Sequence, residues 1–280
     1  MSTKHIHIVG CLPRSGTTLM TELMISCFDI DGYTDHECSI FREFTDAYSV
    51  LCTKNPNDIA RIRYPLKVNP NLYVIYMLRD PRDAIASRSH RNNRANKKIW
   101  GSLGGWLAHH EYAASLKNNP RFITIRYEDL VTRPDETQQY LLRQLPFLRQ
   151  KHRFSEYHLV AKPSEKSAAA LGGARPITPV SVGNWRKQKS FLKAQVEKYG
   201  AIDELLIELG YESDQQWLRE LDEVVSDNTS EPQRKKSSFR RFKDRFFTQP
   251  RRKLLYRLST DKFIGNFVRR LRSKLRALDS

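Results

Sequence analysis

Strand-like and helix-like hydrophobic patterns alternate along this chain. Residues 4–9 alternate polar and apolar side chains, residues 71–78 form a mainly apolar run, and residues 121–127 have a third strand-like pattern. Apolar residues recur at helical spacing in four further segments, 19–28, 100–116, 134–148 and 191–209. Helices that separate strands predict an α/β fold, with a central parallel sheet flanked by helices. Residues 152–174 look irregular, and Gly172-Gly173 would permit a mobile loop there.

The segment between the first predicted strand and the first predicted helix has the composition of an anion-binding loop. Residues 10–18 read Gly-Cys-Leu-Pro-Arg-Ser-Gly-Thr-Thr. Backbone N–H groups and hydroxyls at a helix start converge on one point, where the helix dipole favours an anion. We therefore expect a phosphate here. An ordinary capped turn is the alternative, but it leaves the joint placement of Arg14 and Gly16 unexplained. The common nucleotide-binding pattern does not fit, because Ser15 and Gly16 replace its second glycine and its lysine.

The run Pro-Arg-Ser-Gly-Thr-Thr-Leu, residues 13–19, resembles the donor-binding loop of sulfotransferases that use 3′-phosphoadenosine 5′-phosphosulfate (PAPS). Its form with Pro and Arg is most similar to the protein-tyrosine sulfotransferases and their bacterial relatives. The resemblance implies a three-layer, P-loop-like α/β fold and a sulfuryl-transfer reaction that needs no metal. It also implies that the donor is bound by the residues of this loop, namely Arg14, Ser15, Gly16, Thr17 and Thr18.

A second motif follows the apolar run that ends at Leu78. Arg79 leaves the predicted strand, Asp80 can cap the next helix with Pro81 in its first turn, and Ser87 and Arg91 follow Arg79 by eight and twelve residues. Four residues apart, Ser87 and Arg91 are expected on one helix face. The spacing is similar to the family's 3′-phosphate site. Guanidinium and hydroxyl groups can satisfy phosphate oxygens with charge-assisted hydrogen bonds.

Two later segments extend the resemblance. Tyr127 begins Tyr-Glu-Asp-Leu, similar to a family motif whose tyrosine lies near the adenine or the 3′-phosphate. Residues 179–183, Pro-Val-Ser-Val-Gly, resemble a late loop that closes the donor site, and its lysine, four residues after the glycine, corresponds to Lys187. The family's serine upstream in this loop has no clean equivalent. Gly172 stands at its offset, and the nearby serines are Ser167 and Ser181.

Candidate catalytic groups follow the first helix and the segment 51–54. Glu37 is the best match to the family's base, which removes the proton of the acceptor hydroxyl; a surface carboxylate is the alternative, and His36 is the second candidate base. Lys54 ends an apolar segment directly before a polar turn. It matches a family lysine that contacts the sulfate being transferred. The predicted catalytic residues are therefore Glu37, Lys54 and Arg14.

These motifs predict transfer of a sulfuryl group from PAPS to a hydroxyl, with adenosine 3′,5′-bisphosphate (PAP) as the second product. A carbohydrate or glycan acceptor is slightly favoured over a tyrosine peptide. A P-loop kinase with Asp80 as Mg²⁺ ligand is a rival, but the missing loop lysine and the flanking Arg79 and Pro81 argue against it. A non-catalytic nucleotide-binding tether is a third reading.

Composition limits the remaining possibilities. The chain has 280 residues with 39% hydrophobic content, enough for one full-sized catalytic domain and an appendage. Its four cysteines show no metal-ligand spacing, so we expect reduced thiols and no zinc. We find neither a signal-peptide pattern nor an apolar run long enough to cross a bilayer. The expected location is the cytoplasm.

Most of the net charge of +17 belongs to the C-terminal region. Residues 231–280 hold 17 Lys and Arg against four acids, whereas the first 230 residues are nearly balanced. We expect a catalytic domain over 1–225, a linker over 226–238 and a basic amphipathic tail over 239–280. Such a tail can lie on an anionic membrane surface, here the inner face of the membrane. It could equally recruit an acidic protein or polysaccharide, or remain solvated. No nucleic-acid partner is expected, since no nucleic-acid-binding motif accompanies the charge.

Overall fold

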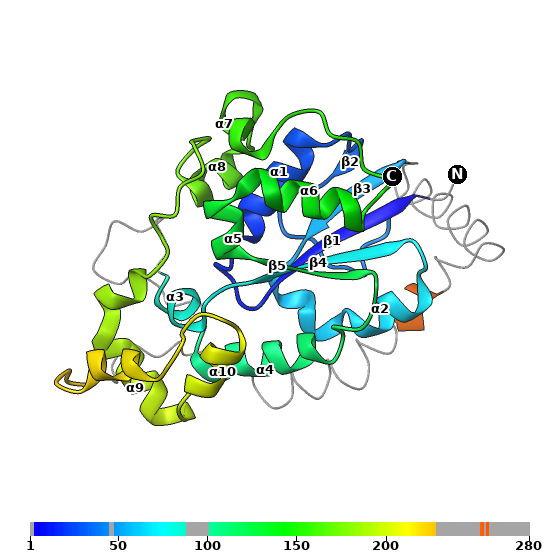
Figure 1. Ribbon diagram of the computed structural model, residues 1–280. Coiled ribbons are helices and arrows are strands. Elements are labelled where there is room, and N and C mark those ends of the chain that lie inside the picture. The colour runs from blue at the N-terminus through cyan, green and yellow to red at the C-terminus, as the bar shows by residue number, and fades with distance from the viewer. Residues whose placement is uncertain (1–2, 45–47, 88–100, 228–252, 255, 258–280) are drawn as a thin grey trace, which may run out of the picture.

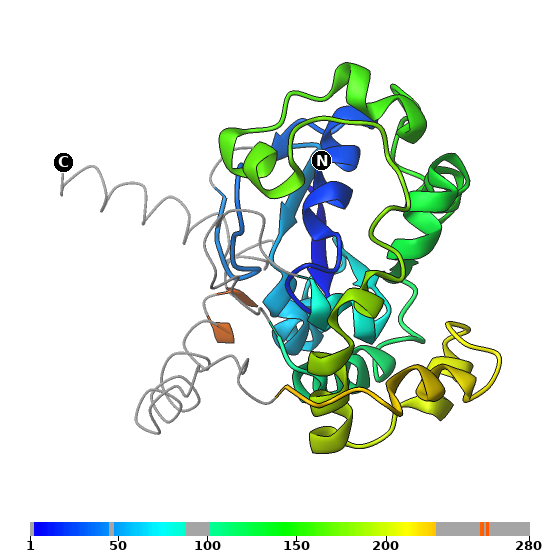
Figure 2. The same cartoon turned by 90° about the vertical axis from the view of Figure 1, so that its left-hand side faces the viewer.

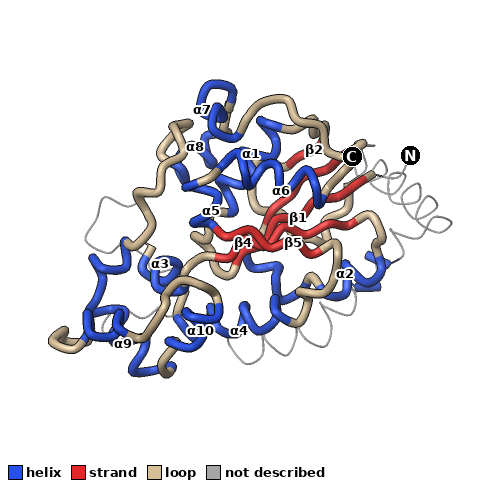
Figure 3. The backbone as a smooth tube through the Cα atoms, viewed as in Figure 1, coloured by secondary structure: helices blue, strands red, loops and turns tan. Residues whose placement is uncertain are grey.

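A parallel sheet forms the centre of the computed structural model, which describes residues 3–44, 48–87, 101–227, 253–254 and 256–257. Five strands pair in the order β2-β3-β1-β4-β5. Their bounds are Lys4–Gly10 (β1), Gly32–Tyr33 (β2), Val50–Lys54 (β3), Leu72–Leu78 (β4) and Phe122–Arg126 (β5). Figure 3 shows the sheet between two layers of helices. The predicted three-layer α/β fold is confirmed.

Helices cover both faces of the sheet (Figure 1). On one side lie α1 (Thr17–Cys27), α5 (Tyr127–Thr132), α6 (Pro134–Gln144), α7 (Tyr157–Val160) and α8 (Glu165–Leu171). On the other side lie α2 (Arg63–Val68), α3 (Pro81–Ala86), α4 (Leu103–Ala114), α9 (Lys189–Tyr199) and α10 (Asp203–Glu208). Four short 3₁₀ helices complete the described elements: η1 (Pro56–Arg61), η2 (Phe154–Glu156), η3 (Asn184–Gln188) and η4 (Gln216–Leu221).

Alternation along the central strands divides the core into two clusters. In β1, Ile6 and Ile8 pack in the cluster under α1, while Val9 belongs to the opposite cluster. In β4, Ile75 packs on the first side and Val74 on the second. Each fully buried aliphatic side chain of this kind contributes about 1.5–3 kcal/mol. The period-two pattern of the sequence therefore fixes which face of each strand meets which helices.

Parallel pairing brings the carboxyl ends of the strands to one edge of the sheet. There β1 passes into the loop before α1, β3 ends at Lys54, β4 is followed by Arg79, and β5 is followed by Tyr127. Ligands of open α/β sheets bind outside this edge. The fold thus gathers motifs that are separated by more than one hundred residues in the sequence.

Three local predictions are wrong. Helix α3 ends at Ala86, and Ser87 adopts an extended backbone (φ −66°, ψ 117°), so Ser87 does not continue the helix face predicted to include Arg91. Arg91 lies outside the described residues. The segment predicted as irregular contains η2, α7 and α8, which are too short to give a clear periodicity. The closing helix predicted over 191–209 is divided into α9 and α10, because Gly200 has φ +95° and interrupts it.

Part of the predicted tail packs against the α/β domain. Tyr256 is buried, its hydroxyl accepts a hydrogen bond from Asn69 Nδ2 (3.1 Å), and its ring meets Phe41 edge-on. The described tail residues, orange in Figures 1 and 2, lie beside α2. The predicted linker and tail otherwise lie almost wholly outside the described residues. Among the helices that are described, none combines the length and the apolar character needed to cross a membrane.

Candidate active site

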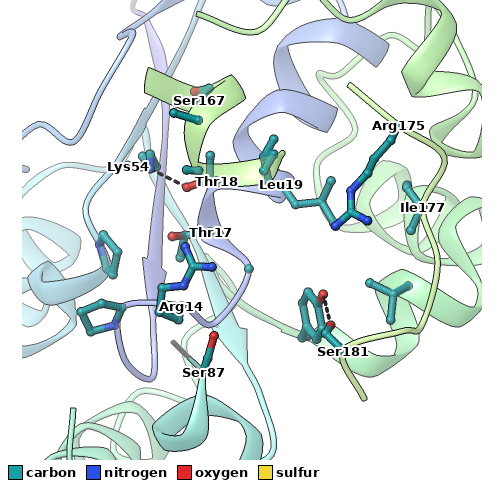
Figure 4. A pocket seen from close by; sticks show the side chains of 18 of the residues that line it. Arg14, Thr17, Thr18, Leu19, Lys54, Ser87, Ser167, Arg175, Ile177 and Ser181 are labelled. Atoms are coloured by element: carbon teal, nitrogen blue, oxygen red, sulfur yellow. Dashed lines mark hydrogen bonds between the residues drawn. The ribbon is translucent and has the colours of Figure 1, made fainter. Parts of the chain in front are cut away.

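A pocket of about 450 Å³ opens at the carboxyl edge of the sheet. It is lined by the loop between β1 and α1, by Lys54, Arg79 and Tyr127, and by residues of the segment 166–181. Figure 4 shows Arg14, Thr18 and Lys54 on one side of the space and Ser181 on the other. The pocket therefore collects all three sequence motifs.

The anion-binding loop has two left-handed residues, Arg14 (φ +78°) and Gly16 (φ +92°). A side chain at Gly16 would also collide with Tyr127, since an added Cβ would lie 2.4 Å from the ring. The left-handed conformation costs a non-glycine residue about 1–2 kcal/mol, so Arg14 is held there by its surroundings. Gly16 is thus required both by conformation and by the close approach of Tyr127.

The Ser15 side chain points into the loop. Its side chain is fully buried, donates a hydrogen bond to the Leu12 carbonyl (2.8 Å) and does not line the pocket. The neighbouring Thr17 and Thr18 do line the pocket, in the first turn of α1. The loop therefore presents Arg14 and the two threonines to a ligand, while the Ser15 side chain stabilises the turn itself.

Lys54 projects from the end of β3 to the start of α1. It is 5% exposed, lines the pocket, and donates from Nζ to Thr18 Oγ1 at 2.8 Å (Figure 4). Arg14 lines the same wall. Two cations beside a helix N-terminus make this wall strongly attractive to an anion.

Arg79, Tyr127 and Ser181 form the opposite wall. The Arg79 guanidinium donates to the carbonyls of Arg14 (2.8 Å) and Ser181 (2.9 Å) and lies over the Tyr127 ring, 4.4 Å from its centre. The hydroxyls of Tyr127 and Ser181 are hydrogen-bonded at 2.7 Å. Ser87 also lines the pocket. Arg79 and Ser87 of the second motif, Tyr127 and Ser181 of the late loop therefore line one pocket.

The late loop is fixed by a buried carboxylate that sequence reasoning did not single out. Asp83 accepts hydrogen bonds from the backbone N–H groups of Gly183 (2.7 Å) and Trp185 (2.8 Å). Burial and the neighbouring Asp80 raise the pKa of Asp83, although these hydrogen bonds and Arg79 oppose the shift. Asp83 thereby sets the position of Ser181 on the pocket wall.

The Asp80 side chain has a structural role. Its carboxylate accepts from the backbone N–H of Arg82 and from the Arg82 guanidinium (2.8 Å), and it does not line the pocket. Arg82 in turn lies between the rings of Trp185 and Trp217. Asp80 is thus the helix cap that the sequence predicts.

Glu37 and His36 are exposed and line the pocket on the Lys54 side. The residues that follow Glu37 connect this segment to the rest of the domain. Cys38 N–H donates to the Lys54 carbonyl (2.9 Å), and Ile40 N–H donates to Asp58 (2.6 Å). Both candidate bases therefore remain beside the cation predicted to bind the sulfate.

Lys187 is not brought to the pocket. It is exposed on η3 and does not line the cavity. Residues that the sequence left unassigned do line it, notably Lys166 and Arg175, and Ser167 contributes the buried serine nearest Lys54 in Figure 4. Within the described part of the chain, no group of three or more His, Cys, Asp or Glu side chains is arranged to hold a metal ion.

Comparison with known proteins gives a consistent result. Residues 33–147 match the model described as "Sulfotransferase family". The solved "Sulfotransferase Domain from the Curacin Biosynthetic Pathway" is 13% identical, with 76% of this chain and 99% of that chain covered, at a TM-score of 0.50. Mouse sulfotransferase SULT7A1 complexed with PAP is 16% identical over 73% of this chain and 84% of that one, at a TM-score of 0.43. No curated protein sequence matches.

Proposed function

We propose that this chain, which has a sulfotransferase fold and a segment that matches the sulfotransferase family, transfers a sulfuryl group from PAPS to an acceptor hydroxyl. The observation that carries the proposal is that one pocket has two cationic walls. Arg14 and Lys54 stand at the start of α1, and Arg79 stands with Tyr127 and Ser181 across from them. PAPS has two anionic ends, the 5′-phosphosulfate and the 3′-phosphate, and the two walls match them.

In this proposal Glu37 removes the proton from the acceptor hydroxyl, with His36 as the alternative base. The acceptor oxygen attacks the sulfur, and the bond between the sulfur and the 5′-phosphate oxygen breaks. The products are a sulfate ester and PAP. Lys54 and Arg14 stabilise the charge that develops on the sulfuryl oxygens and on the leaving phosphate, because fixed cations in a partly enclosed site act without reorganisation.

The other wall binds the nucleoside bisphosphate. Arg79 and Ser87 hold the 3′-phosphate in the proposal, with Arg91 as the third donor of the motif. Tyr127 lies beside the same phosphate or the adenine. Lys187 has weaker support, because it points away from the pocket in this conformation.

A glycan hydroxyl is the proposed acceptor, and a tyrosine hydroxyl is the alternative. The expected setting is the cytoplasm, supported by four free, buried cysteines, with the basic C-terminal region at an anionic membrane surface. A lipid-linked glycan would fit this setting. The rival kinase function has less support, since the Asp80 carboxylate is held by Arg82.

The test is transfer of labelled sulfate from PAPS to a panel of glycans and tyrosine peptides. Lys54→Met should lower kcat about 100-fold, since it removes a cation from the transition state. Lys67→Met, at an exposed lysine on α2, is the matched control and should leave kcat unchanged. Of the two substitutions Glu37→Gln and His36→Gln, the one that lowers kcat more identifies the base. Unchanged turnover in Lys54→Met contradicts the proposed mechanism.

A further inference from the structure

Tyr256, from the basic C-terminal region, is buried against the body of the domain. It is 5% exposed, whereas its described neighbours Lys253 and Leu254 are exposed. Its hydroxyl accepts a hydrogen bond from Asn69 Nδ2 (3.1 Å), at the C-terminal end of α2. Lys253 lies over the ring of Tyr64 on α2, with Nζ 5.7 Å from the ring centre. The described residues of this region therefore pack on α2 (Figure 1).

Asn69 is held in the orientation that its hydrogen bond to Tyr256 needs. Its Oδ1 accepts from the backbone N–H of Asn71 (3.0 Å), so its Nδ2 is directed at the Tyr256 hydroxyl. The carbonyls of Asn69 and Leu72 both accept from the Arg121 guanidinium. Burial raises the pKa of Tyr256 to about 12, so this hydroxyl is neutral at physiological pH. The turn after α2 therefore presents a fixed donor to Tyr256.

The second contact of Tyr256 is with the segment of residues 36–41, which carries both candidate bases. Its ring meets that of Phe41 edge-on, with the centres 5.7 Å apart and the planes at 88°. This is a favourable arrangement for two aromatic rings. Phe41 follows Glu37 by only four residues, and the intervening Ile40 is fully buried. Tyr256 thus joins the end of α2 to the segment that presents Glu37.

The position of Glu37 depends on the residues that follow it, because Glu37 itself is exposed at the pocket. Backbone hydrogen bonds attach the segment 36–41 at Cys38 and Ile40. Phe41 adds an attachment through a side chain, and its partner Tyr256 comes from a distant part of the sequence. A base must lie within hydrogen-bond reach of the acceptor hydroxyl, and a small misplacement slows the reaction strongly. The contact of Tyr256 with Phe41 is therefore well placed to affect transfer.

We propose that Tyr256 is a positioning residue, which holds the segment 36–41 in place through Phe41 and so keeps Glu37 at the pocket. The inference rests on the proposed role of Glu37, or of His36, as the base. Tyr256 does not line the pocket and touches neither the donor nor the acceptor. The basic C-terminal region thereby has a second role, on the proposed acceptor side, beside its proposed contact with an anionic surface.

Hydrogen exchange in the full chain tests this attachment without a transfer assay. The hydrogen-bonded amides of Cys38 and Ile40 should exchange about tenfold faster in Tyr256→Ala, because their segment opens more often. The amide of Cys11, which is hydrogen-bonded to β4, should not change. Leu254→Ala, at a 58% exposed position, is the matched control and should alter none of the three amides. Unchanged exchange at Cys38 and Ile40 in Tyr256→Ala overturns the inference. Faster exchange at all three amides also overturns it, since Tyr256 would then support the whole fold.

Two further variants test whether Tyr256 acts through Phe41. Tyr256→Phe keeps the ring contact, so its exchange and transfer should remain close to those of the parent. Phe41→Ala should reproduce the effect of Tyr256→Ala, and the double variant should be no worse than Phe41→Ala alone, because both changes remove one contact. Additive effects overturn the inference.

The transfer assay gives the effect on the proposed reaction. Tyr256→Ala should lower kcat/KM for the acceptor about tenfold and leave PAP affinity unchanged, since only the segment that carries Glu37 is released. An unchanged kcat/KM in a parent protein that transfers sulfate overturns the inference. If the exchange rates respond as expected while the parent transfers no sulfate to any acceptor, the attachment stands and the proposed function fails.

Discussion

The proposed donor side and the proposed acceptor side of the pocket are built differently. On the donor side, Lys54 and Arg79 are almost fully buried, and the loop is tied to Arg79 and Tyr127 by hydrogen bonds and close packing. On the acceptor side, Glu37 and His36 are exposed on a segment attached through Cys38 and Ile40. The proposed donor side is thus buried and held by hydrogen bonds, whereas the proposed acceptor side is exposed to solvent.

This difference has a physical basis. A charged donor is bound by N–H groups and cations. These groups stabilise charge most strongly when they are already held in position before the donor binds. An acceptor needs only its hydroxyl placed beside the base and the sulfur. The proposed acceptor segment is therefore free to vary in shape, and the proposal rests more firmly on the donor side of the pocket than on the acceptor side.

The largest expected effect lies at the donor loop. Gly16→Ala would combine a left-handed backbone with a collision against Tyr127, so we expect PAP binding to weaken about 100-fold or more and the protein to lose a few kcal/mol of stability. Titration calorimetry and thermal unfolding measure the two effects.

Gly200→Ala provides the matched control for this substitution. Gly200 has φ +95°, but an added Cβ would meet nothing within 4 Å, and the residue does not line the pocket. Its backbone (φ +95°, ψ 167°) lies in a region that essentially only glycine adopts, so the variant should lose about 1–3 kcal/mol of stability and keep full PAP affinity. Equal loss of affinity in both variants would mean that the close fit against Tyr127 is not what forms the donor site.

A smaller effect, on transfer and not on PAP binding, is expected when Asp58 is changed. Asp58 anchors the segment that carries Glu37. Its carboxylate accepts from Ile40 N–H and lies 3.4 Å from His7 Nε2. Burial tends to raise the pKa of Asp58, but the neighbouring His7, the hydrogen bond from Ile40 and the charge of Arg61 lower it on balance. Asp58→Asn should reduce transfer about tenfold through misplacement of Glu37, with PAP affinity unchanged.

The control is Asp31→Asn, which alters another carboxylate that accepts two backbone N–H groups, those of Ser49 and Val50, away from Glu37. It should leave transfer intact. The parent protein should also lose stability in acid as the pH falls through the lowered pKa of Asp58, because a carboxylate with a depressed folded-state pKa stabilises the fold only while ionised. Asp58→Asn should lack this part of the acid transition.

The difference between the two sides also explains what the sequence could predict. The loop 13–19, Arg79 and Tyr127 are local signals at strand ends, and a parallel sheet must bring strand ends together. Asp83 and Asp58 could not be assigned in this way, since their roles depend on which distant backbone groups they meet.

Two further residues show where spacing along the chain is not enough. Ser15 belongs to the motif, but its hydroxyl turns to Leu12, because a tight turn needs its own carbonyl satisfied. Lys187 stands at the family's offset, yet the short helix η3 directs it to solvent. Spacing along the chain predicts which residues are near a site, whereas the direction of a side chain depends on local backbone geometry.

The most direct test of the central claim is calorimetric titration of the protein with PAP and, separately, with ATP and Mg²⁺, in the parent and in Arg79→Ala. The proposed donor site predicts tight binding of PAP that is weakened at least tenfold in the variant, since Arg79 supplies a charge-assisted contact to the 3′-phosphate. Preference for ATP with Mg²⁺, or PAP binding that is indifferent to Arg79, would contradict the account.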